Sequence, residues 1–216
     1  MSLSLPFTTA EFFALFRAYN LSVWPAPVIL SVLGLLAPAL VLSAARRKDV
    51  LISLILASLW AWTALAYHAL FFSRINPAAW LFAGLSLAAA AILIWQGVWR
   101  RELRFGWPGW AQGVPAGLLV AFALVGYPLW STLAGHPYPG MPTFGTPCPT
   151  TLFTLGMLGL VPRPYPRGPL LIPLFWSLVG VQAAWLMGIW PDLSLLVAAL
   201  FGGYLLLYAG RPGGGG

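Results

Sequence analysis

Charged residues are scarce in this sequence. Of its 216 residues, only 7% are charged and 60% are hydrophobic, and the mean hydropathy is +0.87. In soluble domains about a quarter of residues are charged, so this shortage excludes an ordinary soluble domain. A transmembrane helix needs about 20 apolar residues, which leaves room for roughly six or seven spans and little else. The composition therefore predicts an all-α polytopic membrane helix bundle.

Cysteine and catalytic motifs are also scarce. The single cysteine excludes an intramolecular disulfide and any C-x-x-C pair. The sequence contains no phosphate-binding loop, HExxH, GxSxG, dinucleotide fingerprint or paired carboxylates. No charged residue falls in the middle of an apolar run, which weakens the case for a proton-driven pump. These absences leave a Ser/His/Asp hydrolase unsupported and favour a protein that is not an enzyme.

The basic residues mark membrane topology. The net charge is +7, but the 11 lysines and arginines stand singly or in short clusters at the ends of apolar runs. Basic residues in short loops concentrate on the cytoplasmic side of a membrane. Their placement therefore predicts the lipid bilayer, and not nucleic acid, as the partner of this chain.

The N-terminal segment 1–24 differs from the rest. Thr8 and Glu11 form a capping-box pattern, and aromatic residues follow over about three turns. This stretch is too short and too polar to span, so we expect an amphipathic helix in the membrane interface that ends before Trp24-Pro25. No basic residue precedes the apolar part, which argues against a cleaved signal peptide. We expect one transmembrane domain over 1–210 and a flexible tail over 211–216.

Apolar runs define the expected spans. They cover 26–45, 50–73, 77–99, 112–134, 149–161, 169–188 and 191–209. The fifth run would extend only about 20 Å as a helix, against a hydrocarbon core of about 30 Å. It either begins below the membrane surface or does not cross.

Charge distinguishes the two topologies. With seven spans and the N-terminus outside, nine basic residues become cytoplasmic: Arg46, Arg47, Lys48, Arg100, Arg101, Arg104, Arg163, Arg167 and Arg211. Only Arg17 and Arg74 then lie outside, whereas a re-entrant fifth segment would give six against five. The positive-inside rule favours seven spans, with the N-terminus outside and the C-terminus inside.

The stretch GHPYPGMPTFGTPCPTT, residues 135–151, is the first candidate for a chemical site. Proline favours the first helical position, so Cys148 is expected at the N-cap of the short fifth helix, with Thr150 and Thr151 in its first turn. A helix dipole there favours a thiolate. The plainer interpretation is a small buried hydrophobic residue, since lone cysteines in apolar proteins are commonly buried. Irregular backbone at this depth must line a pocket or pack as a plug.

Soft ligands are assigned to the same outer third of the membrane. His68, His136, Met141 and Cys148 together would suit copper(I), and two imidazoles could ligate haem, although the spacing matches no metal signature. For the histidines we favour plainer roles: a helix–helix hydrogen bond for His68 and a solvated turn for His136.

The short outer turn Arg74-Ile75-Asn76-Pro77 adds two polar side chains to this end of the chain. Arg74 could attract an anionic ligand to the pocket. We favour instead that it reaches lipid headgroups or pairs with Asp192 or Glu11.

Three segments carry a family resemblance. They are PFTTAEFFALFRAYNLSVWPAP, AWTALAYHALFFSRINPAAWLF and PTFGTPCPTTLFTLG. The chain resembles, over nearly its whole length, a family of bacterial multi-span membrane proteins of unknown function. The resemblance implies a bacterial cytoplasmic membrane and transfers no catalytic residue. The matching segments contain His68, Arg74, Asn76 and Cys148.

These observations lead to a first hypothesis about function: an outward-facing site for a small ligand or soft metal, in transport or sensing. Its residues are Cys148, His136, His68, Thr150, Thr151, Arg74 and Asn76, with Cys148, His136, His68 and Met141 as metal ligands. The second hypothesis is an accessory or scaffold subunit that packs against other membrane subunits or a second copy of the chain. A thiol-dependent membrane enzyme is third.

Overall fold

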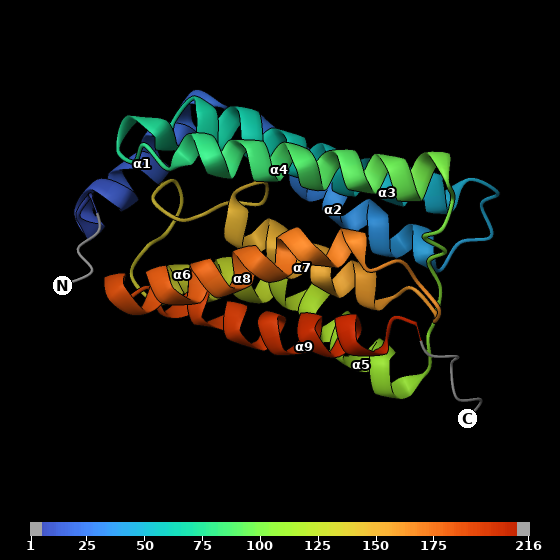
Figure 1. Cartoon of the computed structure of the whole chain (residues 1–216). Coiled ribbons are helices and arrows are strands. Elements are labelled where there is room, and N and C mark those ends of the chain that lie inside the picture. Colours follow the sequence, from blue (N-terminus) through green and yellow to red (C-terminus); the bar gives the residue numbers. More distant parts are fainter. Residues whose placement is uncertain (1–5, 211–216) are drawn as a thin grey trace.

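The computed structural model describes residues 6–210 and is all-α over that range, in agreement with the composition. Apart from the first helix, its long helices run side by side along one common direction (Figure 1). In chain order the α-helices are α1 (Thr9–Ser22), α2 (Ala26–Val41), α3 (Lys48–Trp62), α4 (Ala79–Leu93), α5 (Trp110–Ala121), α6 (Tyr127–Leu133), α7 (Pro147–Gly159), α8 (Gly168–Met187) and α9 (Ser194–Tyr208). The expected tail 211–216 lies outside the described residues.

Several α-helices continue as short helices of other types. The π-helical segments η1 (Thr63–Ala69), η3 (Ile94–Trp99) and η4 (Phe122–Gly126) extend α3, α4 and α5. Two short 3₁₀ segments, η2 (Phe72–Arg74) and η5 (Trp190–Leu193), lie in connections at one end of the bundle. π-helical turns are rare and are frequent at functional sites, and here they carry Tyr67 and His68 and precede Tyr127.

Helix α1 is a separate element, as the sequence predicts. The Thr8 side chain accepts a hydrogen bond from the Glu11 backbone N–H, and the Glu11 side chain accepts one from the Thr8 backbone N–H, which forms the capping box. Helix α1 bends by 87° relative to α2. One face of α1 packs on the connection between α3 and α4 through Phe12, Phe16 and Tyr19.

Five helical segments are long and apolar enough to cross a membrane, or six if the bent pair α1 and α2 is one span. They are Lys48–Arg74, Ala79–Trp99, Trp110–Leu133, Gly168–Met187 and Trp190–Tyr208. Helix α7 has only 13 residues, and all of them except Cys148 are buried. The fifth segment is thus short, as the sequence predicts, but it begins at Pro147 instead of Pro149.

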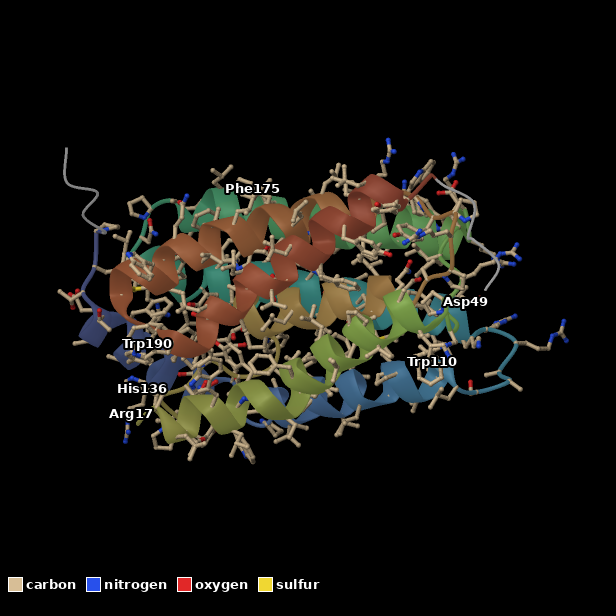
Figure 2. The ribbon with its side chains drawn as sticks, turned by 90° about the horizontal axis from the view of Figure 1, so that it is seen from below. Arg17, Asp49, Trp110, His136, Phe175 and Trp190 are labelled. Carbon is tan, nitrogen blue, oxygen red and sulfur yellow. The ribbon has the colours of Figure 1, made fainter. Side chains whose placement is uncertain are left out.

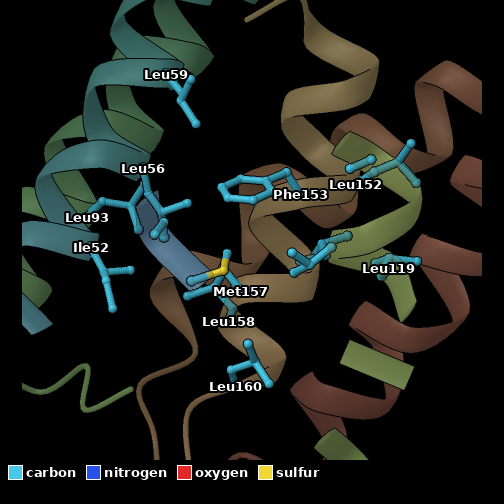
Figure 3. Close-up of a cluster of buried hydrophobic side chains, with 14 of the residues drawn as sticks. Ile52, Leu56, Leu59, Leu93, Leu119, Leu152, Phe153, Met157, Leu158 and Leu160 are labelled. Carbon is cyan, nitrogen blue, oxygen red and sulfur yellow. The ribbon is translucent and has the colours of Figure 1, made fainter. Parts of the chain in front are cut away.

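Helix α7 lies at the centre of the bundle. It contacts α3, α5, α8 and α9. Figure 3 shows Phe153 and Met157 of α7 directed towards the side chains of Ile52 and Leu56 on α3. The indole N–H of Trp60 donates to the Thr154 hydroxyl at 3.0 Å, so a hydrogen bond also joins α3 to α7. A central position explains why this short helix is buried on every face.

The connections separate into two ends. Segments 42–47, 100–109 and 160–167 lie at the end of the bundle where α9 finishes, which is called the C-terminal end. Segments 70–78, 134–146 and 188–193 lie at the opposite end beside α1 (Figure 1). Eight of the described basic residues are at the C-terminal end: Arg46, Arg47, Lys48, Arg100, Arg101, Arg104, Arg163 and Arg167. Arg17 and Arg74 are at the α1 end. Function is therefore best sought at two chemically different ends.

Candidate functional site

A cavity of about 120 Å³ lies at the α1 end of the bundle. Its walls come from α1, the α3–α4 connection, α4, the start of α7, α8 and η5. The lining residues are Phe7, Phe12, Phe16, Tyr67, Phe72, Asn76, Phe82, Thr146, Pro147, Cys148, Trp176, Val179, Gly180, Ala183, Met187 and Asp192. A cavity of about 150 Å³ holds benzene, so this one suits a molecule of similar size.

A thiol and a carboxylate line this cavity, and a buried phenol contacts the carboxylate. The Asp192 carboxylate accepts a hydrogen bond from the Tyr127 hydroxyl, and the Cys148 thiol lies in the same stretch of wall. Asp192 is 4% exposed and Tyr127 is fully buried. The Tyr127 hydrogen bond satisfies part of the carboxylate's capacity, but neither Tyr127 nor Cys148 carries a positive charge. The cavity therefore has an acidic group without a charge partner in its wall.

Local geometry brings Asp192 to this position. Gly188 caps the C-terminus of α8, and its left-handed backbone (φ +68°) suits a residue without a Cβ. The chain then reverses through η5 into α9, and the backbone N–H of Ile189 donates to the Ala184 carbonyl at 3.0 Å. This tight turn buries Asp192 between α8 and α9 and turns it towards the start of α7.

Trp176 and His68 add unpartnered polar atoms. Trp176 and Cys148 both line the cavity, and the Trp176 indole N–H has no hydrogen-bond partner within the described part of the chain. His68 is fully buried beside it, with ring centroids 5.1 Å apart, and neither of its nitrogens has a hydrogen-bond partner among residues 6–210. The helix–helix hydrogen bond favoured for His68 is thus wrong. Buried polar groups without partners are rare, which makes this wall suited to a polar ligand.

The loop before α7 is held inside the bundle. Asn20 is fully buried, and its side-chain amide donates to the carbonyls of Pro139 and Met141 at 2.7 and 2.8 Å. Its side-chain oxygen accepts from the Thr143 hydroxyl at 2.7 Å. The Thr63 hydroxyl donates to the Gly145 carbonyl at 2.9 Å. The loop is therefore packed as a plug up to Gly145, and the residues that follow it line the cavity.

Replacing Asn20 with leucine should release this loop. The change leaves two carbonyls and one hydroxyl without partners inside the protein, and each such group costs about 1–3 kcal/mol. We expect thermal unfolding of detergent-purified protein to begin at a clearly lower temperature. Thr132→Val is the matched control, because the Thr132 hydroxyl bonds only the Pro128 carbonyl of its own turn and is exposed. Equal Tm values for the two variants would contradict this role of Asn20.

The structure brings together part of the residue set expected from the sequence. Cys148, Asn76 and the first turn of α7 lie at the cavity. Cys148 is the second helical residue and not the N-cap, because α7 begins earlier and Thr146 is its N-cap. The hydroxyls of Thr150 and Thr151 are buried without partners. The Asn76 side chain accepts from the Ala78 backbone N–H at 3.0 Å and shapes the turn beside the cavity.

The other expected residues lie elsewhere. His136 stacks on Phe13, with centroids 3.6 Å apart, and lines a separate pocket with Trp190. It is half-buried there, and not a freely solvated turn residue as the sequence suggested. Met141 faces a third hollow beside α2. The four proposed metal ligands thus do not converge, and no group of three His, Cys, Asp or Glu side chains suited to a metal occurs within residues 6–210.

Arg74 makes neither of the expected ion pairs. Its guanidinium lies over the Phe71 ring, 4.8 Å from the centroid. In the described part of the chain, the one ion pair joins Arg100 to Glu102 at the opposite end. The pairing with Asp192 or Glu11 was therefore wrong, because Asp192 points into the bundle while Arg74 is exposed.

Sequence analysis did not identify Asp192, Tyr127 and Trp176 as site residues. One feature of the sequence could have identified Asp192: it is one of only four acidic residues, and it stands at the start of an apolar run. No feature of the sequence distinguishes Tyr127 and Trp176, since mid-span aromatic residues ordinarily pack against neighbouring helices.

The fold and the site define a class: an all-α bundle of apolar helices with a small aromatic cavity at one end. The chain belongs to a family of unknown function, DUF6064, whose model matches residues 9–212. The expected resemblance to a family of unknown function over nearly the whole chain is confirmed. No curated protein and no solved structure matches the chain significantly.

Proposed function

We propose that this protein is a multi-span protein of a bacterial cytoplasmic membrane, with its cavity on the outer side. Seven crossings, by α2, α3–η1, α4–η3, α5–α6, α7, α8 and α9, would put the α1 end outside and the C-terminus inside. The distribution of basic residues between the two ends supports this orientation. Helix α1 would then lie in the outer interface.

We further propose that the cavity binds a small organic cation, for transport or sensing. One observation carries this proposal: the buried Asp192 carboxylate faces a cavity walled by aromatic rings, and no lining residue is basic. Burying a charge without a partner costs several kcal/mol, which a cationic ligand would offset. Aromatic faces attract cations, with about 2 kcal/mol or more for a desolvated pair.

The aromatic wall has the geometry that such a ligand needs. Tyr67 stacks on Phe16 and on Phe72, with centroids 5.6 and 5.7 Å apart. Phe82 stacks on Phe72 at 6.5 Å and meets Trp176 edge to face at 4.9 Å, which continues the aromatic wall. Ammonium groups that carry methyl substituents are recognised in cages of this kind. A small amine or methylated ammonium therefore fits the walls, and Asp192 supplies the opposite charge.

The thiol-enzyme hypothesis has less support. Cys148 contacts a carboxylate and not an imidazole, and His68 lies behind Trp176. A nucleophilic cysteine ordinarily needs an adjacent base or a positive environment to form its thiolate. Asp192 disfavours a negative thiolate beside it. Cys148 is better placed as a hydrogen-bond donor to the carboxylate.

The test uses choline and its uncharged isostere 3,3-dimethylbutan-1-ol. We expect millimolar choline to raise the Tm of the purified protein, because a ligand that binds only the folded state stabilises it. It should also slow N-ethylmaleimide labelling of Cys148, the only cysteine, several-fold by filling the cavity. The alcohol should do neither. Equal effects of both compounds would show an apolar site, and no effect of either would favour the scaffold hypothesis.

A further inference from the structure

A second, larger hollow lies at the opposite end of the bundle. It has a volume of about 820 Å³ and is lined by Arg46, Arg47, Asp49, Val50, Arg101 and Arg104. The arginines come from two connections, 42–47 and 100–109, that are distant in sequence and adjacent in space (Figure 1). The hollow thus gathers four positive charges against one negative charge.

These four guanidinium groups are available to a ligand. All four arginines are exposed, and none takes part in an ion pair within the described residues. Neighbouring basic residues are committed elsewhere: Arg100 pairs with Glu102 at 2.6 Å, and the Lys48 ammonium donates to the carbonyls of Val41 and Ser43. The hollow therefore gathers four of the arginines at this end that form no ion pair within residues 6–210.

The wall that carries Arg101 and Arg104 is held in place. The Phe105 backbone N–H donates to the Asp49 carboxylate at 2.8 Å, and the Gly106 N–H donates to the Leu160 carbonyl at 2.8 Å. Leu103 and Phe105 are buried, so Arg104 between them is directed outward. The Asp49 carboxylate is thereby used to fix this wall, which reduces its repulsion of an anion in the hollow.

The backbone conformation of Arg101 supports a preformed binding site in this hollow. Its φ is +54°, a left-handed conformation that costs a residue with a Cβ of order 1–3 kcal/mol and clusters at functional positions. Asp49 and Val50 belong to the first turn of α3, whose N-terminus has no side-chain cap. Uncapped backbone N–H groups and the helix dipole favour an anion at the same place.

Exposed tryptophans indicate where this hollow lies in a membrane. Trp99 and Trp110 flank the 100–109 connection and Trp107 lies within it, and the three are 70%, 78% and 54% exposed. Figure 2 shows Trp110 and Asp49 at the same end of the bundle. Tryptophan is enriched at the level of lipid headgroups. The anion that can reach the hollow most directly is therefore the phosphate of a lipid in the surrounding leaflet.

We propose that this hollow binds the phosphate-bearing headgroup of an anionic phospholipid. Four guanidinium groups offer the planar pairs of donors that phosphate oxygens accept. A lipid phosphate would also offset the mutual repulsion of the arginines, which no acidic side chain but Asp49 relieves at this position. The headgroup would anchor the C-terminal end of the bundle at a fixed depth.

The test counts bound lipid by native mass spectrometry of the detergent-purified full chain. Short-chain phosphatidylglycerol should bind at least about tenfold more tightly than phosphatidylcholine. Arg46→Gln/Arg104→Gln should remove about tenfold or more of that preference, because each basic residue near the lipid contributes roughly a factor of five. Arg100→Gln/Arg167→Gln removes the same charge from the same end outside the hollow, and we expect its effect to stay within about twofold.

Three results would overturn the proposal. Equal losses in both double variants would mean that the preference comes from general surface charge. Equal binding of the two lipids by the unchanged protein would mean that no anionic site exists. The third measurement adds millimolar inorganic phosphate to the protein. If phosphate displaces phosphatidylglycerol and raises the Tm as much as the lipid does, the hollow binds free phosphate and not a lipid headgroup. Unchanged Tm values of both variants without lipid verify that they fold.

Discussion

Replacing Asp192 with asparagine should abolish the stabilisation of this protein by choline. Asparagine keeps an acceptor for the Tyr127 hydroxyl but removes the negative charge that a cation requires. Truncating one partner of a buried charge pair costs about 2–5 kcal/mol, so the affinity for choline should fall by roughly 30-fold or more. The measurement is the Tm of the purified protein as a function of choline concentration.

The same variant should not unfold the protein in the absence of choline. Removing a buried charge that lacks a partner is often neutral or stabilising. Glu102→Gln is the matched control, because it removes one acidic charge at the far end of the bundle, where Glu102 pairs with Arg100. We expect choline to stabilise Glu102→Gln as it does the unchanged protein. A full choline response in Asp192→Asn would refute the proposed cation site.

Replacing Gly156 with alanine should force α5 and α7 apart. A Cβ at this position would lie 2.9 Å from the Val120 backbone nitrogen and 3.0 Å from the Ala116 carbonyl oxygen. Backbone atoms cannot move aside by changing a rotamer, so the central helix itself must shift. Overpacking of this kind costs about 1–3 kcal/mol, and we expect the Tm to fall on the order of 5–10 °C.

Gly117→Ala on α5 is the control for this prediction. A Cβ at Gly117 would have no neighbour within 4 Å, so alanine fits there and suits a helix better than glycine by about 1 kcal/mol. We expect Gly117→Ala to keep or raise the Tm in the same detergent. The close approach of α5 and α7 would be disproved if Gly156→Ala were as stable as this control.

Some local features were predictable because they depend on neighbouring residues only. The capping box of Thr8 and Glu11 formed as expected, and the break at Trp24-Pro25 separates α1 from α2. The short apolar run that became α7 was also visible, because helix length follows from the number of apolar residues. The start of α7 was misplaced by two residues, since Pro147 and Pro149 are both acceptable in a first helical turn.

The site was only partly predictable. Cys148 attracted attention as the single cysteine in an unusual loop, whereas His136 and Met141 from the same loop point into other hollows. Nearness in sequence did not mean nearness in space. Asn20 of α1 binds the carbonyls of Pro139 and Met141, and in this conformation of the loop its side chains point in different directions. The soft-metal set therefore does not assemble.

The sequence by itself determined an all-α chain of apolar helices with basic residues at their ends, because composition and the lengths of apolar runs depend on no distant contact. Only the tertiary structure decided that Tyr127 and Cys148 lie at the Asp192 carboxylate, although 65 positions separate Tyr127 from Asp192. It also decided that four arginines from two connections face one hollow. Such meetings depend on how the helices pack around α7, and no local pattern encodes that packing.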